Sequence, residues 1–351
     1  MKLPTLPAAS WLLIVAVNMP LATAQETSPV ILRNRPAAQR FTSDQVEAAG
    51  TGLPTWIGKF SYKGKNYHYT MVGSDPSKGS TTTVPVYIVP LKLTFSDGTV
   101  FDASTDMINE TISATEAVIE SPIFQSAPFT EGTIDVGTTQ YIDAFMRANF
   151  WDSVSVNTGY HMLVGNPTVL PVQAYTVPKG SGSTMAGPVK PYKRGTLDQN
   201  FIDDNITPEI FKAFPQITPG TFTIFLTYNV FPGGAYGYHD VYGGSSSTGL
   251  TYAYVSYLEP YVQLIDADIS TLAHEVAEWT DDPYISNETP CGILEVGDPL
   301  NYAIFEIDLN GMVWHPQDLA FVGYFFQTPI PSVNGWLTFK NTYMTPCANG
   351  S

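Results

Sequence analysis

The sequence predicts an α+β fold, with a β-rich N-terminal half and a C-terminal half in which a mixed sheet supports an active-site helix. Three observations lead to this class. Residues 84–95 are rich in β-branched and apolar side chains, and residues 221–231 and 251–258 repeat that character. Residues 269–282 then change to the apolar spacing of a helix. Strands that precede a single strongly patterned helix are typical of this class.

Residues 1–24 have the composition of a secretory signal peptide. Lys2 gives a basic start, residues 11–17 are apolar, and Ala-Thr-Ala at 22–24 forms a small-residue cleavage pattern before Gln25. This apolar run is too short for a membrane span, and no later run reaches about 20 apolar residues. We therefore expect a secreted or extracytoplasmic protein without an integral membrane segment after signal removal.

The charge balance limits the possible partners. The chain carries 16 Lys and Arg against 32 Asp and Glu, which gives a formal net charge of −16. Nucleic acids and anionic membranes bind clustered basic side chains, so neither is expected here. The 20 Tyr, 19 Phe and 6 Trp are enough for a large core or a binding groove. The expected partner is a peptide or an extracellular polymer.

The length of the chain allows one elaborate domain or two lobes, and we expect two. The first is a β-rich lobe over residues 25–195, and the second covers residues 196–351. Residues 165–195 are rich in Pro, Gly and Ser and are predicted to be a loop that connects the lobes. Gly-Ser-Gly-Ser at 180–183 is predicted to be its most flexible part.

Five segments carry clear secondary-structure patterns. Residues 56–101 are strand-like, residues 115–125 form a short helix, and residues 138–151 form a longer helix with one apolar face. Residues 221–231 and 251–258 are predicted strands of the C-terminal lobe.

The helix that follows carries the sequence His-Glu-Val-Ala-Glu at 274–278. We expect Asp268 or Ser270 to cap its N-terminus and Pro283 to end it. Its predicted apolar stripe consists of Ile269, Leu272, Ala273 and Val276.

The spacing in this helix is suited to a metal ion. His274 and Glu278 lie one turn apart on the same face, so both can bind one ion without distorting the helix. Glu275 is turned away by about 100° and would act as the general base that takes a proton from water. A catalytic zinc usually has three protein ligands and an open position. Glu295 is the expected third ligand, and Asp298 is expected to orient His274 from the second shell.

Two questions about the ion stay open. His239, just before the second strand, competes with Glu295 for the third position, and His315 is a weaker candidate. One histidine with two carboxylates is a harder ligand set than two histidines with one carboxylate. Zinc is expected from the motif, and Mn²⁺ or Ca²⁺ are the alternatives that the harder ligand set favours. In the simplest alternative no ion binds, His274 hydrogen-bonds a carboxylate, and Glu275 and Glu278 face solvent.

Two further features bear on the C-terminal lobe. Cys291 and Cys347 are the only cysteines, and in an exported protein we expect them to form a disulfide. Asp281 and Asp282 lie at the helix C-terminus, where the macrodipole disfavours acids. They form either an Asp-Pro turn, or a site that binds a metal or the backbone of the following chain.

The motif segments resemble two groups of proteins. His-Glu-Val-Ala-Glu-Trp-Thr-Asp-Asp-Pro, followed by Leu-Glu-Val-Gly-Asp-Pro-Leu, is similar to the gluzincin pattern of metallopeptidases at His274, Glu275 and Glu295. Glu278 stands where that pattern has a second histidine. The same segments resemble the exported plant phosphate-induced (exordium-like) group, in which HELAE precedes a Glu-x-Gly-Asp segment.

The resemblance extends over residues 221–347. His-Pro-Gln-Asp-Leu at 315–319 and Ser-Val-Asn-Gly-Trp at 332–336 are also similar to uncharacterised secreted bacterial proteins with this helix. The resemblance implies a zincin-like C-terminal lobe.

Three functions follow as expectations. The first is a secreted metal-dependent hydrolase of peptide bonds, with a metal on His274, Glu278 and Glu295 and water activated by Glu275. The second is a non-catalytic extracellular or cell-envelope binding protein on the same zincin-like scaffold. The third is a structural calcium site without chemistry.

Overall fold

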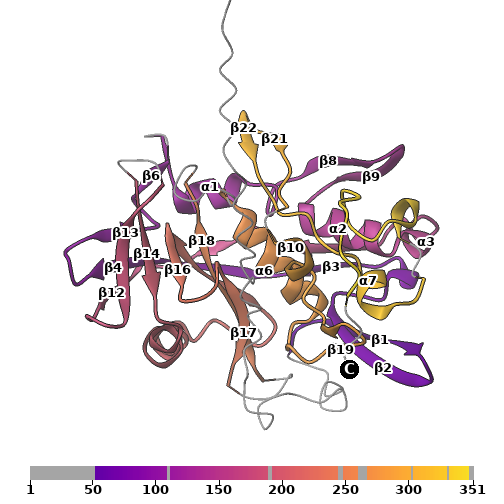
Figure 1. Ribbon diagram of the computed structural model, residues 1–351, viewed down its shortest axis with the longest axis horizontal. Coiled ribbons are helices and arrows are strands. Elements are labelled where there is room, and N and C mark those ends of the chain that lie inside the picture. The colour runs from indigo at the N-terminus through magenta and orange to yellow at the C-terminus, as the bar shows by residue number, and fades with distance from the viewer. Residues whose placement is uncertain are drawn as a thin grey trace, which may run out of the picture. The chain divides into compact units, whose positions relative to one another are not determined.

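A seven-stranded mixed sheet forms the centre of the fold in the computed structural model (Figure 1). The structure describes residues 52–108, 111–188, 192–243, 248–259, 267–301, 303–329 and 332–347. All of them belong to one compact unit, residues 31–351. The predicted signal peptide and the start of the predicted N-terminal lobe lie outside the described residues.

Three long parallel strands make the core of the sheet, in the order β4, β15, β18. Strand β17 pairs antiparallel with β18, while β11 and β12 run parallel to β4 and β5 runs antiparallel to it. These strands are β4 (Val86–Phe95), β5 (Val100–Asp102), β11 (Thr168–Val169), β12 (Gln173–Val177), β15 (Phe222–Tyr228), β17 (Tyr238–Tyr242) and β18 (Leu250–Tyr257). Every residue of β15 is buried, as expected for a parallel strand covered on both faces.

Smaller sheets surround this one. A three-stranded sheet has the order β13 (Gly182–Ala186), β14 (Lys193–Leu197), β16 (Val230–Pro232). The two-stranded pairs are β1 (Thr55–Tyr62) with β2 (Lys65–Val72), β3 (Thr81–Val84) with β10 (His161–Val164), β6 (Met107–Ile108) with β7 (Ile112–Ser113), β8 (Ala127–Glu131) with β9 (Ile134–Thr139), β19 (Glu288–Thr289) with β20 (Gly292–Ile293), and β21 (Ile307–Leu309) with β22 (Met312–Trp314).

The helices are short apart from α2 and α6. They are α1 (Ala114–Glu120), α2 (Tyr141–Asn149), α3 (Trp151–Val154), α4 (Gln199–Phe201), the π-helix η4 (Ile202–Ile206), α5 (Thr207–Ala213), α6 (Ser270–Asp281) and α7 (Val322–Phe326), with 3₁₀ turns η3 (Pro76–Lys78), η5 (Asp298–Leu300) and η6 (Val333–Gly335). A capping box fixes the start of α1, because Ser113 and Glu116 each bond the other's backbone N–H. The coexistence of helices with mixed sheets confirms the predicted α+β class.

Helix α6, which carries the motif, packs against β17, β18, β2 and α2 (Figure 1). Its predicted apolar stripe is buried, and the Trp279 ring stacks on Phe222 of β15 with 4.0 Å between centroids. The polar side chains of the helix are almost all buried too, including Glu275 and Glu278. The helix therefore places its charged groups inside the protein.

The predicted caps of α6 are wrong. The helix begins at Ser270 without a side-chain cap. Asp268, at a φ of 36°, instead accepts hydrogen bonds from the backbone N–H groups of Ile269 (2.5 Å) and His315 (2.9 Å). The His315 ring nitrogen Nδ1 lies 2.6 Å from the same carboxylate. Local sequence could not predict this pairing, because His315 comes from a distant part of the chain. The helix ends at Asp281, before Pro283 as predicted.

The predicted loop over residues 165–195 is also wrong, because β11, β12, β13 and part of β14 form there. Gly182, which lies in the stretch that the sequence predicts to be flexible, has a packing role. A Cβ on Gly182 would lie 2.7 Å from the Thr196 carbonyl oxygen and 2.9 Å from the Phe95 ring. Glycine is needed here so that β13 can approach its neighbours closely.

The other predicted elements are present. Strands occupy most of residues 56–101, α1 overlaps the first predicted helix, α2 lies within the second, and β15, β16 and β18 match the two later strands. Strand β4 pairs directly with β15. The central sheet therefore joins segments from both sides of the lobe boundary that the sequence predicts at residue 195.

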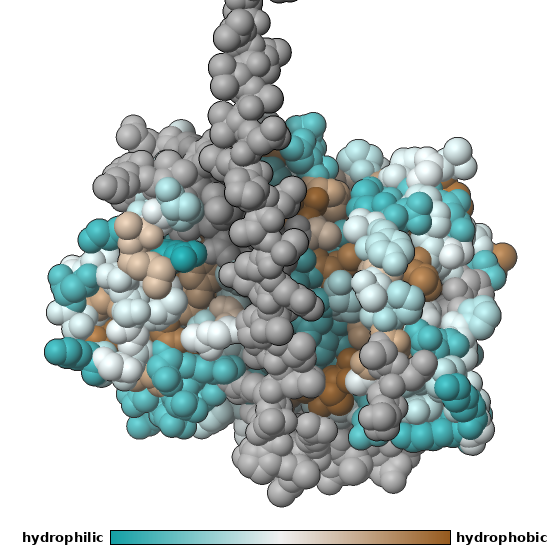
Figure 2. Space-filling model, in the orientation of Figure 1, coloured by the Kyte–Doolittle hydropathy of each residue, from teal (hydrophilic) through white to brown (hydrophobic). Residues whose placement is uncertain are grey.

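The surface carries scattered apolar side chains. Exposed examples come from separate elements, such as Ile57 of β1, Met185 of β13 and Val313 of β22. Hydrophilic and apolar residues are intermixed on the described part of the face in Figure 2. Single exposed apolar side chains are normal for a protein surface and indicate no particular partner. Within the described ranges, no helix is long and apolar enough to cross a membrane.

Candidate metal centre

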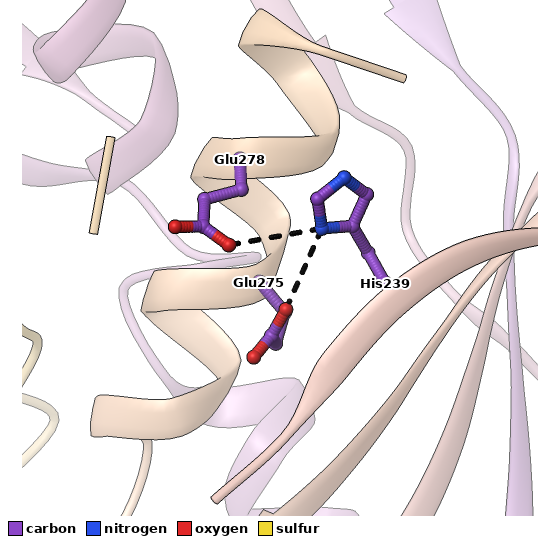
Figure 3. A group of neighbouring side chains, drawn as sticks. All are labelled: His239, Glu275 and Glu278. Carbon is purple, nitrogen blue, oxygen red and sulfur yellow. Dashed lines mark ion pairs between the residues drawn. The ribbon is translucent and has the colours of Figure 1, made fainter. Parts of the chain in front are cut away.

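Two histidines from different elements meet the carboxylates of helix α6. His274 Nε2 lies 2.9 Å from Glu278 Oε1, one helical turn away. His239 reaches the helix from β17, and its Nδ1 lies 3.6 Å from Glu275 Oε2 and 3.7 Å from Glu278 Oε2. Figure 3 shows both carboxylates pointing toward this nitrogen. Glu278 therefore faces one histidine with each of its two oxygens.

The sheet brings His239 to this position. It lies opposite Ala253 of β18 in the antiparallel β17–β18 pair, on which α6 packs. Its Nε2 lies 3.2 Å from the backbone carbonyl oxygen of Asp282. A carbonyl oxygen only accepts hydrogen bonds, so Nε2 carries the proton and Nδ1 can present its lone pair to the carboxylate side.

His274 is held in the same manner by Gln317. Its Nδ1 lies 2.9 Å from Gln317 Oε1, and Gln317 Nε2 donates to the Gly297 carbonyl oxygen at 2.6 Å. The second bond sets the orientation of the amide, so its oxygen faces the ring and accepts from Nδ1–H. Nε2 then faces Glu278 and can bind an ion in place of its proton. A metal-binding histidine almost always donates its other N–H in this way. Sequence reasoning gave Gln317 no role, and only its place in the 315–319 stretch singled it out.

The segment after the helix closes the site. The Gly297 N–H donates to Glu278 Oε1 at 3.1 Å, and Asp298 Oδ1 lies 3.9 Å from His274 Nε2. Burial and the nearby Glu278 carboxylate raise the pKa of Glu295. A Cβ on Gly297 would lie 2.5 Å from His274 Nδ1, so only glycine allows the turn to approach the ring this closely.

Two sets of side chains have the geometry of a metal site. His239, Glu275 and Glu278 form one, and His274, Glu278 and Asp298 form the other, with ligand atoms within 4.8 Å of one another in each. Two ligands of a tetrahedral zinc, each about 2.0–2.1 Å from the ion, lie about 3.3 Å apart. The separations of 2.9 and 3.9 Å around His274 bracket that value. The donor atoms and the orientation of both imidazoles fit a divalent cation.

The site holds more negative charge than its histidines balance. Burial by itself lowers the pKa of His274 and His239, but the carboxylates of Glu275 and Glu278 outweigh burial and raise both pKa values. Burial raises the pKa of Glu275. Burial acts the same way on Glu278, but the charge of His274 outweighs it and lowers the pKa to about 2. Such electrostatics favour the binding of a cation.

The structure places the predicted site residues as follows. It brings His274, Glu275, Glu278 and His239 together, and Asp298 belongs to the set that contains His274, whereas Glu295 belongs to neither set of ligand atoms. Glu275 and Glu278 are only 4% and 3% exposed, so they do not face solvent as the simplest alternative requires. His315 is bound to Asp268 instead.

The two acids at the end of α6 differ in role. Asp282 accepts hydrogen bonds from the backbone N–H groups of Ser286 and Asn287, both at 2.9 Å. It therefore binds the chain that follows, which is one of the two open interpretations. The buried carboxylate of Asp281 has no hydrogen-bond partner among the described residues.

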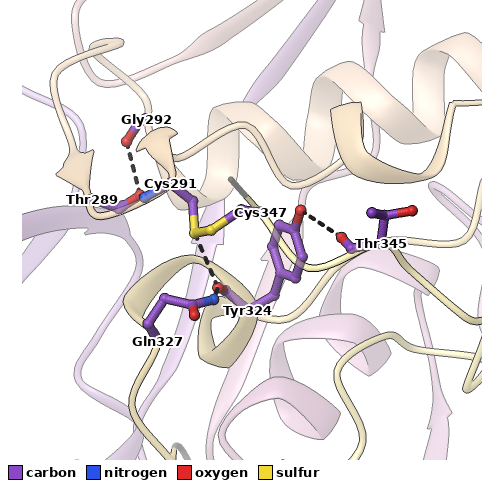
Figure 4. The surroundings of a disulfide bond; sticks show 7 residues. All are labelled: Thr289, Cys291, Gly292, Tyr324, Gln327, Thr345 and Cys347. Atoms are coloured by element: carbon purple, nitrogen blue, oxygen red, sulfur yellow. Dashed lines mark hydrogen bonds between the residues drawn. A yellow bond between two sulfur atoms is a disulfide. The ribbon is translucent and has the colours of Figure 1, made fainter. Parts of the chain in front are cut away.

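The predicted disulfide between Cys291 and Cys347 is present, with 5.7 Å between the Cα atoms (Figure 4). Neighbouring bonds fix its surroundings: the Tyr324 hydroxyl donates to the Thr345 carbonyl oxygen, and the Cys291 N–H donates to Thr289 Oγ1. The crosslink ties the segment between α6 and Glu295 to the C-terminal end of the chain.

Comparison with protein-family models, with curated proteins and with solved structures finds no match to this chain. The functional argument therefore rests on the geometry of the site.

Proposed function

We propose that this protein is a secreted metal-dependent hydrolase of peptide bonds whose cation is held by helix α6. The ligands would be His274 Nε2, Glu278 Oε1 and an oxygen of Asp298. The observation that carries the proposal is the orientation of His274, whose Nδ1 is bound by Gln317 while Nε2 faces two carboxylates. Asp298 replaces Glu295 as third ligand in this proposal, because its carboxylate belongs to the set of ligand atoms that contains His274 and Glu278.

When bound, a divalent cation would lower the pKa of a coordinated water and polarise the scissile carbonyl. Glu275 is buried beside the ligands and would act as the general base. It takes one proton as the water oxygen attacks the carbonyl carbon, and it returns that proton to the leaving amine nitrogen as the C–N bond breaks.

The nature of the ion follows from the ligands. One imidazole with two carboxylates suits Zn²⁺ or Mn²⁺, and Ca²⁺ is less suited to a site that contains a nitrogen ligand. The packing of α6 against β17 and β18 supports a zincin-like arrangement of sheet and helix. The disulfide supports export, because such bonds persist in oxidising compartments.

Elemental analysis and a peptide-library assay test the proposal together. The purified wild type should contain a divalent cation and cleave peptides. Glu275→Gln should lower the cleavage rate by at least about 100-fold, the lower end of general-base contributions, while His274 keeps its cation. Glu120→Gln is the matched control, since Glu120 is an exposed glutamate at the end of α1.

Two outcomes would contradict the proposal. A wild type without a tightly bound cation removes its basis. A wild type that holds the cation, cleaves nothing in the library and binds a polymer supports the non-catalytic binding protein.

A further inference from the structure

The central carboxylate of the site, Glu278, is shared by two complete sets of ligand atoms. Its Oε1 faces His274 Nε2 at 2.9 Å, and its Oε2 faces His239 Nδ1 at 3.7 Å. Each set also has its own second carboxylate, Asp298 beside His274 and Glu275 beside His239. A carboxylate can bind one ion with each oxygen, whereas a histidine on this helix would offer the site a single nitrogen.

Both histidines are oriented as ligands by independent parts of the chain. Gln317 Oε1 accepts from Nδ1 of His274, and the Asp282 carbonyl oxygen accepts from Nε2 of His239. The two rings thus use opposite nitrogens for the outer hydrogen bond, and each turns its remaining nitrogen toward Glu278. If one ion bound at His274 alone, nothing in that site would require the second ring to be aligned in this way.

The charges of the carboxylates also favour two ions in the site. Glu275, Glu278 and Asp298 together carry three negative charges when ionised, and their ion pairs within the described residues are with His239 and His274 only. A single divalent cation leaves this set negative when both imidazoles are neutral ligands. A second cation offsets the remainder beside Glu275 and Glu278, which are both buried.

We propose that the site binds two divalent cations bridged by Glu278. The outer ion would be held by His274, Glu278 Oε1 and Asp298, and the inner ion by His239, Glu278 Oε2 and Glu275 Oε2. The ion-pair proposal shares helix α6 with the proposed function and does not otherwise rest on it. Carboxylate-bridged ion pairs lie about 3.5–4 Å apart and clamp both the attacking and the leaving atom of a hydrolysis. Ligation through Oε2 leaves Oε1 of Glu275 for the proton transfer.

The two positions differ in access to solvent. The side chains of Asp298 and His274 are 37% and 14% exposed, whereas those of His239, Glu275 and Glu278 are 3–5% exposed. The outer ion should therefore exchange with solvent and the inner ion should leave slowly. A chelator should release the ions in two phases, and cleavage activity should be lost in the faster one.

The experiment counts ions in the full mature chain, using Mn²⁺ and Zn²⁺ separately as probes. Apoprotein is titrated by calorimetry, the stoichiometry is checked by elemental analysis after gel filtration, and the Mn²⁺ form is examined by electron paramagnetic resonance. The wild type should bind two ions per chain, with the spectrum of an exchange-coupled Mn²⁺ pair.

The variants separate the two positions. His239→Ala should reduce the stoichiometry to one ion and leave the spectrum of an isolated Mn²⁺. Glu278→Ala should lose tight binding of both. His68→Ala is the matched control, because His68 is exposed on β2, and it should keep two ions. If His239→Ala fails to fold by circular dichroism, Glu275→Gln tests the inner position instead.

The failures of the two proposals are distinguishable. One ion per wild-type chain at saturation, or two ions retained in both His239→Ala and Glu275→Gln, overturns the ion pair. Cleavage by a protein with one ion leaves the hydrolase proposal standing. Two bound ions with no cleavage support the ion pair and contradict the hydrolase proposal.

Discussion

A substitution of Gln317 tests the proposed metal site without changing any of its ligands. Gln317→Ala removes the acceptor for His274 Nδ1 at 2.9 Å and the donor to the Gly297 carbonyl oxygen at 2.6 Å. Loss of such an outer partner weakens metal affinity by about 10–100-fold, or about 1.4–2.7 kcal/mol. The apoprotein should also lose about 1–3 kcal/mol of unfolding free energy, since two hydrogen bonds disappear.

A competition titration with a chromophoric chelator measures the affinity, and urea unfolding of the apoprotein measures the stability. Gln317→Glu should restore the affinity, because a carboxylate also accepts from Nδ1–H. It should still lose stability, because its second oxygen cannot donate to Gly297. Gln173→Ala is the control, since Gln173 bonds only neighbouring carbonyl oxygens on the edge of β12. Metal affinity within twofold of wild type in Gln317→Ala would refute the reasoning.

Three further predictions concern single positions. Cys291→Ser should cost about 4 kcal/mol of unfolding free energy in urea, because the bond to Cys347 closes a loop with a sequence separation of 56; an unchanged midpoint contradicts this. Gly297→Ala should weaken metal binding at least about tenfold, because the added Cβ meets the His274 ring. The backbone of Gly297 has an ordinary φ of −84°, so backbone strain does not contribute. An equal dissociation constant rules out this weakening. Burial raises the pKa of Asp281 well above 3.8, so its contribution to stability is present below pH 3.8 and is lost as pH rises through the raised value. Asp281→Asn should therefore flatten the fall in apoprotein stability as pH rises above 3.8, and an unchanged slope in a pH series of urea midpoints would show that the carboxylate is not the cause.

The local part of the site could be predicted from the sequence. The spacing of His274 and Glu278 places them on one helical face, and the apolar stripe of α6 predicts residues that are buried, although nearly all the polar residues of the helix are buried as well. Both features depend only on helical periodicity. The disulfide was also predictable, because two cysteines allow a single pairing.

The parts of the site that depend on distant pairing were not predictable. Gln317 reaches His274 only because the 315–319 stretch folds back beside the turn at Gly297. The sequence indicates His239 as a competing ligand, but the alignment of its ring depends on the β17–β18 register and on the Asp282 carbonyl. No pattern in the sequence carries either of these distances.

The strands within residues 165–195 show a different limit. They are short and interrupted by Gly and Pro, so composition predicts a loop. The Phe95 ring packs so closely against Gly182 and Gly195 that a larger residue would not fit at either position. Glycine that permits close packing and glycine that permits flexibility have the same appearance in a sequence.

Helix α6 is proposed to bind divalent cations between His274 and His239. Anomalous diffraction from crystals of the Zn²⁺-loaded protein tests this binding, because it locates ions without reference to activity. The account predicts one peak about 2.0–2.2 Å from His274 Nε2, Glu278 Oε1 and an Asp298 oxygen, and a second at the same distance from His239 Nδ1 and Glu278 Oε2. The absence of an anomalous peak within reach of either histidine, in crystals grown from protein saturated with Zn²⁺, would contradict this binding.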